Sequence, residues 1–175
     1  MKRLWIAGLL AFSAAALAQP PQGAPPPPEV KRTVDTFAGT WSLHLKLTPP
    51  GAASIAFPGT WHCQKIAGGT AVDCTLKATA PGLGPMEETD LIGYDPETKA
   101  VHIMTWNNQG EVHDHHGGWQ GDKIVLHHSA TAGGKPVEED FEMTTAGTNK
   151  MSFRFTSKTD EGTATFEGEG TRKPK

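Results

Sequence analysis

The sequence predicts an all-β fold, a single up-and-down antiparallel β-barrel of about ten strands. From Ala38 onward, strand-like runs alternate with turn signals about every ten residues, and no helical period interrupts them. The connections are short, which makes consecutive strands antiparallel neighbours. Such a sheet would have two long exposed edges unless it closed on itself. A two-sheet sandwich is the alternative.

Each expected strand ends at a recognisable turn. Gly68-Gly69, Gly121-Asp122 and Gly133-Gly134 have the composition of two-residue hairpin loops. Four-residue loops are expected at 95–98 and 107–110. Between the turns we expect strands near 39–48, 54–66, 70–80, 86–94, 100–106, 111–119, 123–131, 136–144, 151–157 and 163–172.

Two segments precede the expected barrel domain, residues 37–173. Residues 1–18 resemble an export signal, with a positively charged start, an apolar run from Leu4 to Leu17, and a small-x-small site ending at Ala18. The run is shorter than the ~20 residues of a membrane-spanning helix. Residues 19–36 hold six prolines and predict an extended linker. We therefore expect an exported protein, either periplasmic or secreted.

The charge balance narrows the classes of partner. The chain has 16 basic and 19 acidic residues, a formal net charge of −3, and no basic stripe. This argues against binding of nucleic acid or of anionic membrane surfaces. No second apolar run is long enough to span a bilayer, so membrane insertion is not expected. A protein partner for the proline-rich segment or the acidic surface is an open alternative, and the sequence identifies none.

The predicted register determines whether the two cysteines lie close enough to form a disulfide. With Gly68-Gly69 as the loop, Cys63 lies directly opposite Cys74 on the apolar face of the hairpin. The pair would be a hydrogen-bonded one, with Cα atoms ~5.5 Å apart. Because an exported protein meets an oxidising compartment, we expect a Cys63–Cys74 disulfide. A redox-active pair is the alternative, although no Cys-x-x-Cys spacing supports it.

The first and last strands resemble those of the calycin barrels, the lipocalins and their relatives. Gly39-Thr40-Trp41 opens the first strand, and Arg172 closes the last one. In calycins a basic residue of the last strand covers the tryptophan of such a Gly-x-Trp motif. The resemblance implies that Trp41 plugs one end of the barrel and that Arg172 lies over its indole as a cation–π contact.

A longer stretch resembles the bacterial domain-of-unknown-function family 1579, whose members are similar to calycin barrels. It runs from Leu91 to Lys99 and is followed by Trp106 and the turn at 118–122. The likeness spans roughly residues 37–173. It implies a barrel fold and no established activity.

Six of the eight histidines lie between residues 102 and 128, and the hairpin registers predict which of them point inward. A four-residue loop at 107–110 places His102 opposite His115. The next two loops place His128 opposite His115 and Glu139 opposite His128. The predicted inward set is His102, His113, His115, His128 and Glu139. The histidines predicted to point outward are His44, His62, His116 and His127.

This inward set is a candidate metal site. Directly opposed strand residues have Cβ atoms ~4.5–5.5 Å apart, which suits imidazoles meeting one ion at ~2.0–2.1 Å. Neutral imidazole favours Zn²⁺, Cu²⁺ or Ni²⁺, and Glu139 could be a further ligand or accept a hydrogen bond from one. The alternatives are a polar lining without metal, and haem ligation as in nitrobindin-like barrels, which needs a large apolar pocket.

The sequence favours a binding protein over an enzyme. It contains neither a Gly-x-Ser-x-Gly elbow nor a phosphate-binding glycine loop. Metal-assisted hydrolysis at the histidines is chemically possible and is not the favoured reading. We expect a small apolar or mixed ligand in the interior, although the same side chains could fill it as a core. The expected lining residues are Met104, Trp106, Trp119, Phe141, Phe153 and Phe155.

Overall fold

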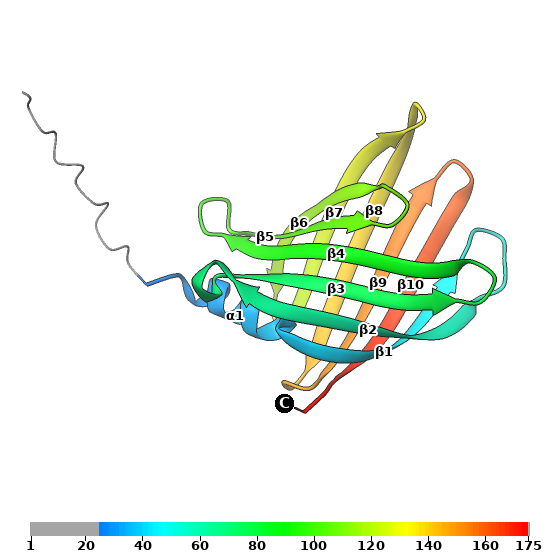
Figure 1. The fold of residues 1–175 in the computed structure, drawn as a ribbon. Helices are drawn as coiled ribbons and strands as arrows, with labels where there is room; N and C mark the ends of the chain where they lie inside the picture. The colour runs from blue at the N-terminus through cyan, green and yellow to red at the C-terminus, as the bar shows by residue number, and fades with distance from the viewer. Residues whose placement is uncertain (1–24, 175) are drawn as a thin grey trace, which may run out of the picture.

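The computed structural model describes residues 25–174, which form a closed antiparallel barrel with a helix at one end (Figure 1). The strands follow one another around the barrel, and β1 pairs with β10 to close it. The elements are α1 (Pro28–Phe37), β1 (Gly39–Thr48), β2 (Ile55–Ile66), η1 (Ala67–Gly69), β3 (Ala71–Ala80), β4 (Gly84–Asp95), β5 (Ala100–Asn107), β6 (Val112–Gln120), β7 (Lys123–Ala132), β8 (Lys135–Ala146), β9 (Lys150–Thr159) and β10 (Gly162–Arg172).

The predicted up-and-down barrel is confirmed, and the sandwich alternative is wrong. Each predicted strand overlaps an observed one. The predicted export signal, residues 1–18, and residues 19–24 of the predicted linker lie outside the described residues. Within residues 25–174, the helices are too short to cross a membrane.

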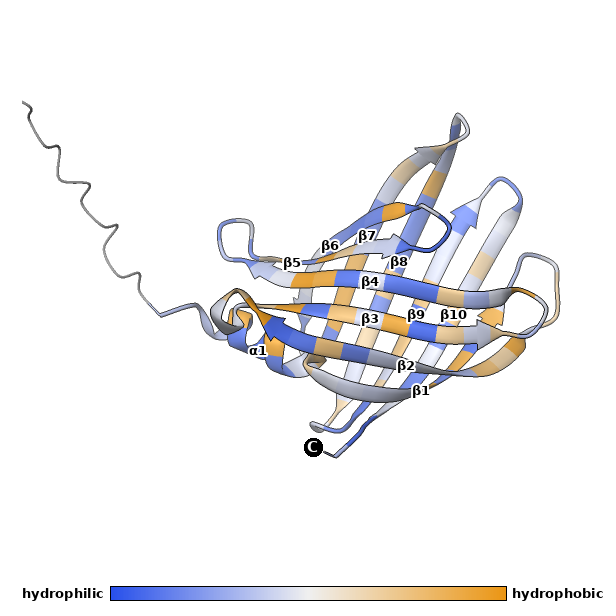
Figure 2. Ribbon diagram, viewed as in Figure 1, coloured by the Kyte–Doolittle hydropathy of each residue, from blue (hydrophilic) through white to orange (hydrophobic). Residues whose placement is uncertain are grey.

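Alternation of apolar and polar residues turns one face of each strand into the barrel. On β1, Trp41, Leu43 and Leu45 are buried, whereas the residues between them are exposed. Figure 2 shows this alternation as bands of orange and blue along the strands. Burial of these apolar side chains is the main source of stability for such a fold.

Glycines on the inner face of β10 make room for large side chains of its neighbours. A Cβ atom on Gly168 would lie 2.2 Å from the ring of Phe153, and one on Gly170 would lie 2.9 Å from Met151. Both distances are too short for real contacts, so Phe153 occupies the space that the missing side chain leaves.

The segment Pro28–Phe37 forms helix α1, so the predicted extended linker is wrong for these residues. Proline is favourable at the first helical position, where its missing N–H costs nothing. Val30, Val34 and Phe37 follow at helical spacing and are 5%, 1% and 0% exposed. The folded domain therefore begins at α1, before the predicted boundary at residue 37.

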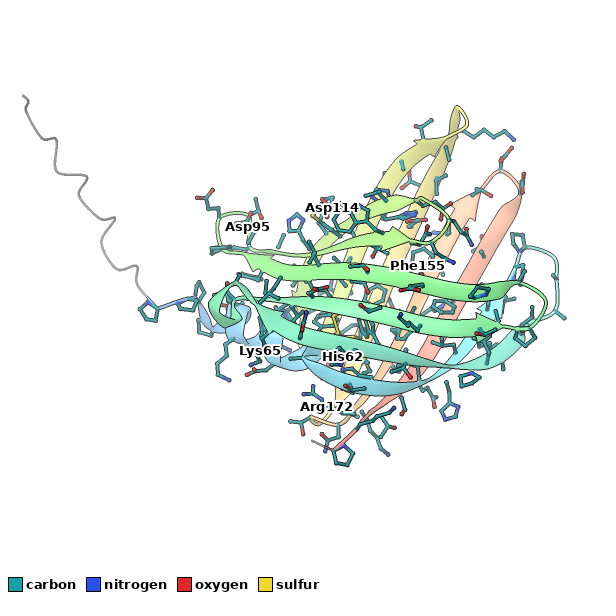
Figure 3. All side chains as sticks on the ribbon, viewed as in Figure 1. His62, Lys65, Asp95, Asp114, Phe155 and Arg172 are labelled. Carbon is teal, nitrogen blue, oxygen red and sulfur yellow. A yellow bond between two sulfur atoms is a disulfide. The ribbon has the colours of Figure 1, made fainter. Side chains whose placement is uncertain are left out.

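Helix α1 closes one end of the barrel together with Trp41 and Arg172. The Trp41 indole N–H donates to the Phe37 carbonyl at 2.8 Å. The Arg172 guanidinium carbon lies 4.4 Å from the centre of the Trp41 ring, so the predicted cation–π contact is present. Arg172 also donates to the carbonyls of Asp35 and Thr36 at 3.0 and 2.9 Å. Figure 3 labels Arg172 near the C-terminal end.

The predicted Cys63–Cys74 disulfide is present between β2 and β3. The predicted register is also correct, but the loop contains four residues, 67–70, instead of two. The Cα atoms of Cys63 and Cys74 are 4.0 Å apart, and not ~5.5 Å as expected for a hydrogen-bonded pair. A four-residue loop keeps the same partners but exchanges hydrogen-bonded for non-hydrogen-bonded positions, and this accounts for the shorter spacing. Such a disulfide is typical of an oxidising compartment.

The connection between β5 and β6 differs from the prediction and changes which side chains of β5 point inward. The Asn107 N–H donates to the Glu111 carbonyl at 3.2 Å, so these two residues close a three-residue loop. Gly110 adopts φ 87° there, as a type I turn followed by a left-handed residue requires. His115 consequently lies opposite Ile103, and His102 lies opposite His116.

Candidate functional site in the barrel mouth

The two ends of the barrel differ. Helix α1 and the β2–β3 turn lie at the closed end, whereas the loops β1–β2, β3–β4, β5–β6, β7–β8 and β9–β10 border the opposite end, called the mouth here (Figure 1). Inward side chains at the closed end, such as Ile124 and Val101, are fully buried. Several inward side chains nearer the mouth, such as Phe155 and His113, are only half-buried. The interior is therefore filled at the closed end and accessible at the mouth.

The interior of the mouth has a polar wall and an apolar wall. The strands β10, β1, β2 and β3 present mostly apolar side chains, including Phe166, Leu45, Phe57 and Leu76. The facing strands β4 to β9 present acidic, histidine and hydroxyl side chains. The inward members of this polar wall are Glu88, Asp90, Thr105, His113, His115, His128, Glu139 and Ser157.

Four members of the polar wall meet at one point and are called the histidine cluster: His113, His115, His128 and Glu139. The three imidazole centres are 5.4 to 5.9 Å apart, a nearly equilateral triangle. Glu139 Oε2 lies 2.8 Å from His113 Nδ1 and 3.1 Å from His115 Nε2. The Ser157 hydroxyl donates to the other carboxylate oxygen at 3.3 Å.

The electrostatics of the cluster centre on Glu139, which is 3% exposed. Burial favours the neutral acid, but the hydrogen bond from His113 and the close approach of the His115 ring outweigh it and hold the pKa of Glu139 at about 2. The same carboxylate raises the pKa of His113 despite partial burial. Glu139 is thus an ionised carboxylate whose charge the neighbouring His113 stabilises.

Asp90 is a second buried carboxyl group, 4% exposed, on the inner face of β4. It accepts hydrogen bonds from the Trp61 indole N–H at 2.9 Å and from the Thr105 hydroxyl at 2.6 Å. Burial raises the pKa of Asp90 above its ordinary value, and the two hydrogen bonds oppose this shift. Asp90 lies nearer the closed end than Glu88, the next inward residue of β4.

Glu88 also carries a perturbed carboxyl group. Burial and the neighbouring Asp90 raise the pKa of Glu88 to about 7. Glu88, Asp90 and Thr105 are candidate site residues that were not predicted from the sequence. A usable signal existed in β4, because Glu88, Asp90 and the core residue Ile92 share one strand face.

The structure brings together four of the five predicted metal ligands and excludes the fifth. His113, His115, His128 and Glu139 form the cluster, but the inward prediction for His102 is wrong. Its ring lies on the outer surface, stacked on His116 at 5.8 Å and 3.2 Å from Asp114 Oδ1. The cause is the three-residue β5–β6 loop, because a shift of one residue turns each side chain of a strand to the other face.

The same shift overturns two predicted ligand-lining residues. Met104 and Trp106 point outward and are 38% and 39% exposed. The other four predicted lining residues, Trp119, Phe141, Phe153 and Phe155, lie on the inner face. Trp119 is at the closed end, where its indole N–H donates to Thr33 at 3.1 Å.

Phe155 has a special position at the boundary between the two walls (labelled in Figure 3). Its ring contacts the His115 ring edge-to-face at a centre distance of 5.6 Å. Phe141 and Phe153 pack against the buried core, whereas Phe155 is half-buried beside the histidine cluster. An apolar ring is thus presented next to imidazole and carboxylate groups.

A hollow of about 540 Å³ lies elsewhere, on the outer face of β8, β9, β10 and β1. Its lining includes Lys46, Arg154 and Glu167, which form ion pairs with one another across the strands. These side chains alternate with the inward ones, so this hollow is separate from the barrel interior.

Comparison with known proteins supports the fold. No family model matches the sequence, and no curated protein matches it. The barrel resembles Rv2717c from M. tuberculosis, with a TM-score of 0.62 and 13% sequence identity over 85% of this chain and 99% of that chain. It also resembles the S-type phycobiliprotein lyase CPES from Guillardia theta, with a TM-score of 0.56 and 9% identity over 81% of this chain and 91% of that chain.

These likenesses establish a calycin-like β-barrel. At 13% and 9% identity they concern the fold alone, because one fold hosts many functions. Membership of the domain-of-unknown-function family 1579 stays a prediction.

Proposed function

We propose that the protein binds a small, partly apolar organic ligand in the mouth of the barrel. The observation that carries this proposal is the half-burial of inward aromatic side chains, above all Phe155 and Phe166. Aromatic rings that point into a barrel yet stay accessible provide an apolar surface for a ligand. The polar wall opposite would orient the polar groups of that ligand.

The proposed ligand carries a hydrogen-bonding or cationic group on an apolar body. Asp90, Glu88 and Glu139 make the polar wall rich in carboxyl oxygens, which accept hydrogen bonds. Phe57, Phe153 and Phe166 form a chain of contacting rings on the other side, with centres 5.8 to 6.3 Å apart. A calycin-like barrel with one accessible end is an architecture that suits such a ligand.

The test is binding of N-phenyl-1-naphthylamine, a neutral apolar probe that fluoresces more strongly when it leaves water. We expect saturable binding by the wild type and loss of binding in Ala164→Trp, because Ala164 lies on the inner face of β10 near the mouth. Trp106→Ala is the matched control, since Trp106 is an exposed aromatic on the outer face. The proposal fails if the probe does not bind, or if Trp106→Ala loses binding and Ala164→Trp keeps it.

We also infer that the protein is exported. The Cys63–Cys74 disulfide supports this, because disulfides persist in oxidising compartments. The charged start and apolar run of residues 1–18 agree with it. Mass spectrometry of the protein from its native cell is expected to give a chain that starts at Gln19 in the exported fraction. A chain that retains Met1 in the cytoplasm would contradict the inference.

A further inference from the structure

The histidine cluster has the donor atoms of a metal site. One nitrogen each of His113 and His128 and one oxygen of Glu139 lie within 4.8 Å of one another. The donors of a tetrahedral zinc site lie about 3.4 Å apart, given metal–ligand distances of ~2.0–2.1 Å. Closing the site around an ion therefore requires side-chain shifts of about 1 Å, which rotations about χ1 and χ2 can supply.

His115 provides a second, independent observation in favour of a metal site. It is only 7% exposed, and its Nε2 atom is buried without a hydrogen-bond partner. This atom lies 3.1 Å from Glu139 Oε2, but the two groups are not aligned as donor and acceptor. A buried polar atom without a partner is unfavourable, and this one is aimed at the carboxylate that would coordinate the ion.

His128 is held in the tautomer that a ligand needs. Its Nδ1 atom lies 3.0 Å from the backbone carbonyl of Asp114. A carbonyl only accepts hydrogen bonds, so Nδ1 carries the proton and Nε2 has a free lone pair. Histidine ligands in metal sites are commonly oriented in this way, through a hydrogen bond from the other ring nitrogen.

We propose that the histidine cluster binds a divalent cation of the zinc class inside the barrel mouth. Two imidazoles and one carboxylate, with the imidazole of His115 beside them, suit Zn²⁺, and also Cu²⁺ and Ni²⁺, whereas Mg²⁺ and Ca²⁺ prefer oxygen ligands alone. A dication would neutralise Glu139 and give His115 Nε2 the partner it lacks. This proposal goes beyond the proposed binding of an organic ligand, and the two sites share Glu139.

The experiment is calorimetric titration of the EDTA-treated and dialysed full chain with ZnSO₄, with MgSO₄ as the reference salt. The inner variant is His113→Gln/His128→Gln. The matched control is His116→Gln/His127→Gln, which changes the neighbouring histidines of the same two strands that face outward. We expect one Zn²⁺ per chain in the wild type and in the control, and at least about 100-fold weaker binding in the inner variant. MgSO₄ should give no saturable heat.

Two further measurements test whether the inner variant folds and whether imidazole coordinates the metal. Circular dichroism reports whether the inner variant folds, and the single variant His113→Gln, at a half-buried position near the mouth, replaces it if it does not. Visible absorption of the Co²⁺-loaded protein reports imidazole coordination without any activity assay. The proposal is overturned if the wild type binds no Zn²⁺, if the folded inner variant binds as tightly, or if the outward control loses binding instead.

Discussion

The indole N–H of Trp61 donates a 2.9 Å hydrogen bond to the buried carboxyl group of Asp90, which joins β2 to β4 across the barrel interior. Trp61 also contacts Phe37 of α1 edge-to-face, with ring centres 5.6 Å apart. The polar wall of the mouth is thus connected directly to the apolar core at the closed end. This connection makes Asp90 a residue with consequences for stability as well as for the site.

Replacement of Asp90 should separate the loss of a hydrogen bond from the loss of a charge. Asp90→Ala leaves the Trp61 N–H without a partner and should lower the free energy of unfolding by about 2 kcal/mol. Asp90→Asn keeps an acceptor for Trp61 and offers a donor to the Thr105 hydroxyl, so it should cost much less. Urea unfolding measures both. Asp122→Ala, at an exposed turn position, is the control, and equal losses for the Ala and Asn variants at Asp90 would contradict the assignment.

The raised pKa of Glu88 predicts that the free energy of unfolding depends on pH. Its folded-state pKa of about 7 is higher than the ordinary value of 4.5, so the folded protein holds this proton more tightly than the unfolded chain. The stabilising contribution of this proton is complete below pH 4.5 and is lost as the pH rises through 7. Glu88→Gln should match the wild type near pH 4 and exceed it at pH 8 by up to about 3 kcal/mol. Thermal unfolding across this range measures the difference, and Glu97→Gln, at an exposed turn position, should show none.

Arg172 should contribute to stability through its geometry and not only through its charge. It combines the stacking on Trp41 with hydrogen bonds to two carbonyls of α1. Lysine cannot reproduce the planar guanidinium, so Arg172→Lys should lose about 1–2 kcal/mol and Arg172→Ala more. Arg154→Ala, in an exposed ion pair, should stay within about 0.5 kcal/mol of wild type. An Arg172→Lys variant as stable as the wild type would refute this role.

Replacement of Phe37 tests whether α1 is part of the folded domain or only a linker. Phe37 is fully buried, and its replacement by alanine should cost about 3 kcal/mol or more of unfolding free energy. Lys31→Ala, on the exposed side of the same helix, should be nearly neutral. Chemical denaturation of the two variants measures the contrast. A small effect of Phe37→Ala would mean that the barrel is stable without α1.

The strand order and most registers follow from the sequence because glycine-rich turns fix where each hairpin reverses. The pairs Cys63–Cys74, Trp119–Ile124 and His128–Glu139 are the predicted ones. In each case the turn is short, and the apolar face of at least one strand is unambiguous. A closed barrel is then favoured, because closure pairs both edges of the sheet.

The wrong orientation of β5 and the unpredicted helix α1 have separate physical causes. The run Asn107–Gly110 reads equally as a four-residue loop or as part of a three-residue loop, and only backbone geometry at Gly110 decides between them. That single choice reversed the expected orientation of His102, Met104 and Trp106. Helix α1 was not predicted because the prolines before it suggested extended structure. Val30, Val34 and Phe37 nevertheless follow one another at helical spacing and are buried.

The location of α1 and Arg172 at one end of the barrel affects how the chain could be rearranged. The backbone carbonyls of Asp35 and Thr36 accept hydrogen bonds from the last residue of β10, so the last strand ends beside the last turn of α1. A peptide long enough to run back along α1 could join the two ends of the folded body, and the chain could be opened at Gly133-Gly134 in the β7–β8 turn. Such a circular permutant would keep each strand pairing of the barrel and place its new ends beside the mouth. A reporter fused there would respond directly to whatever enters.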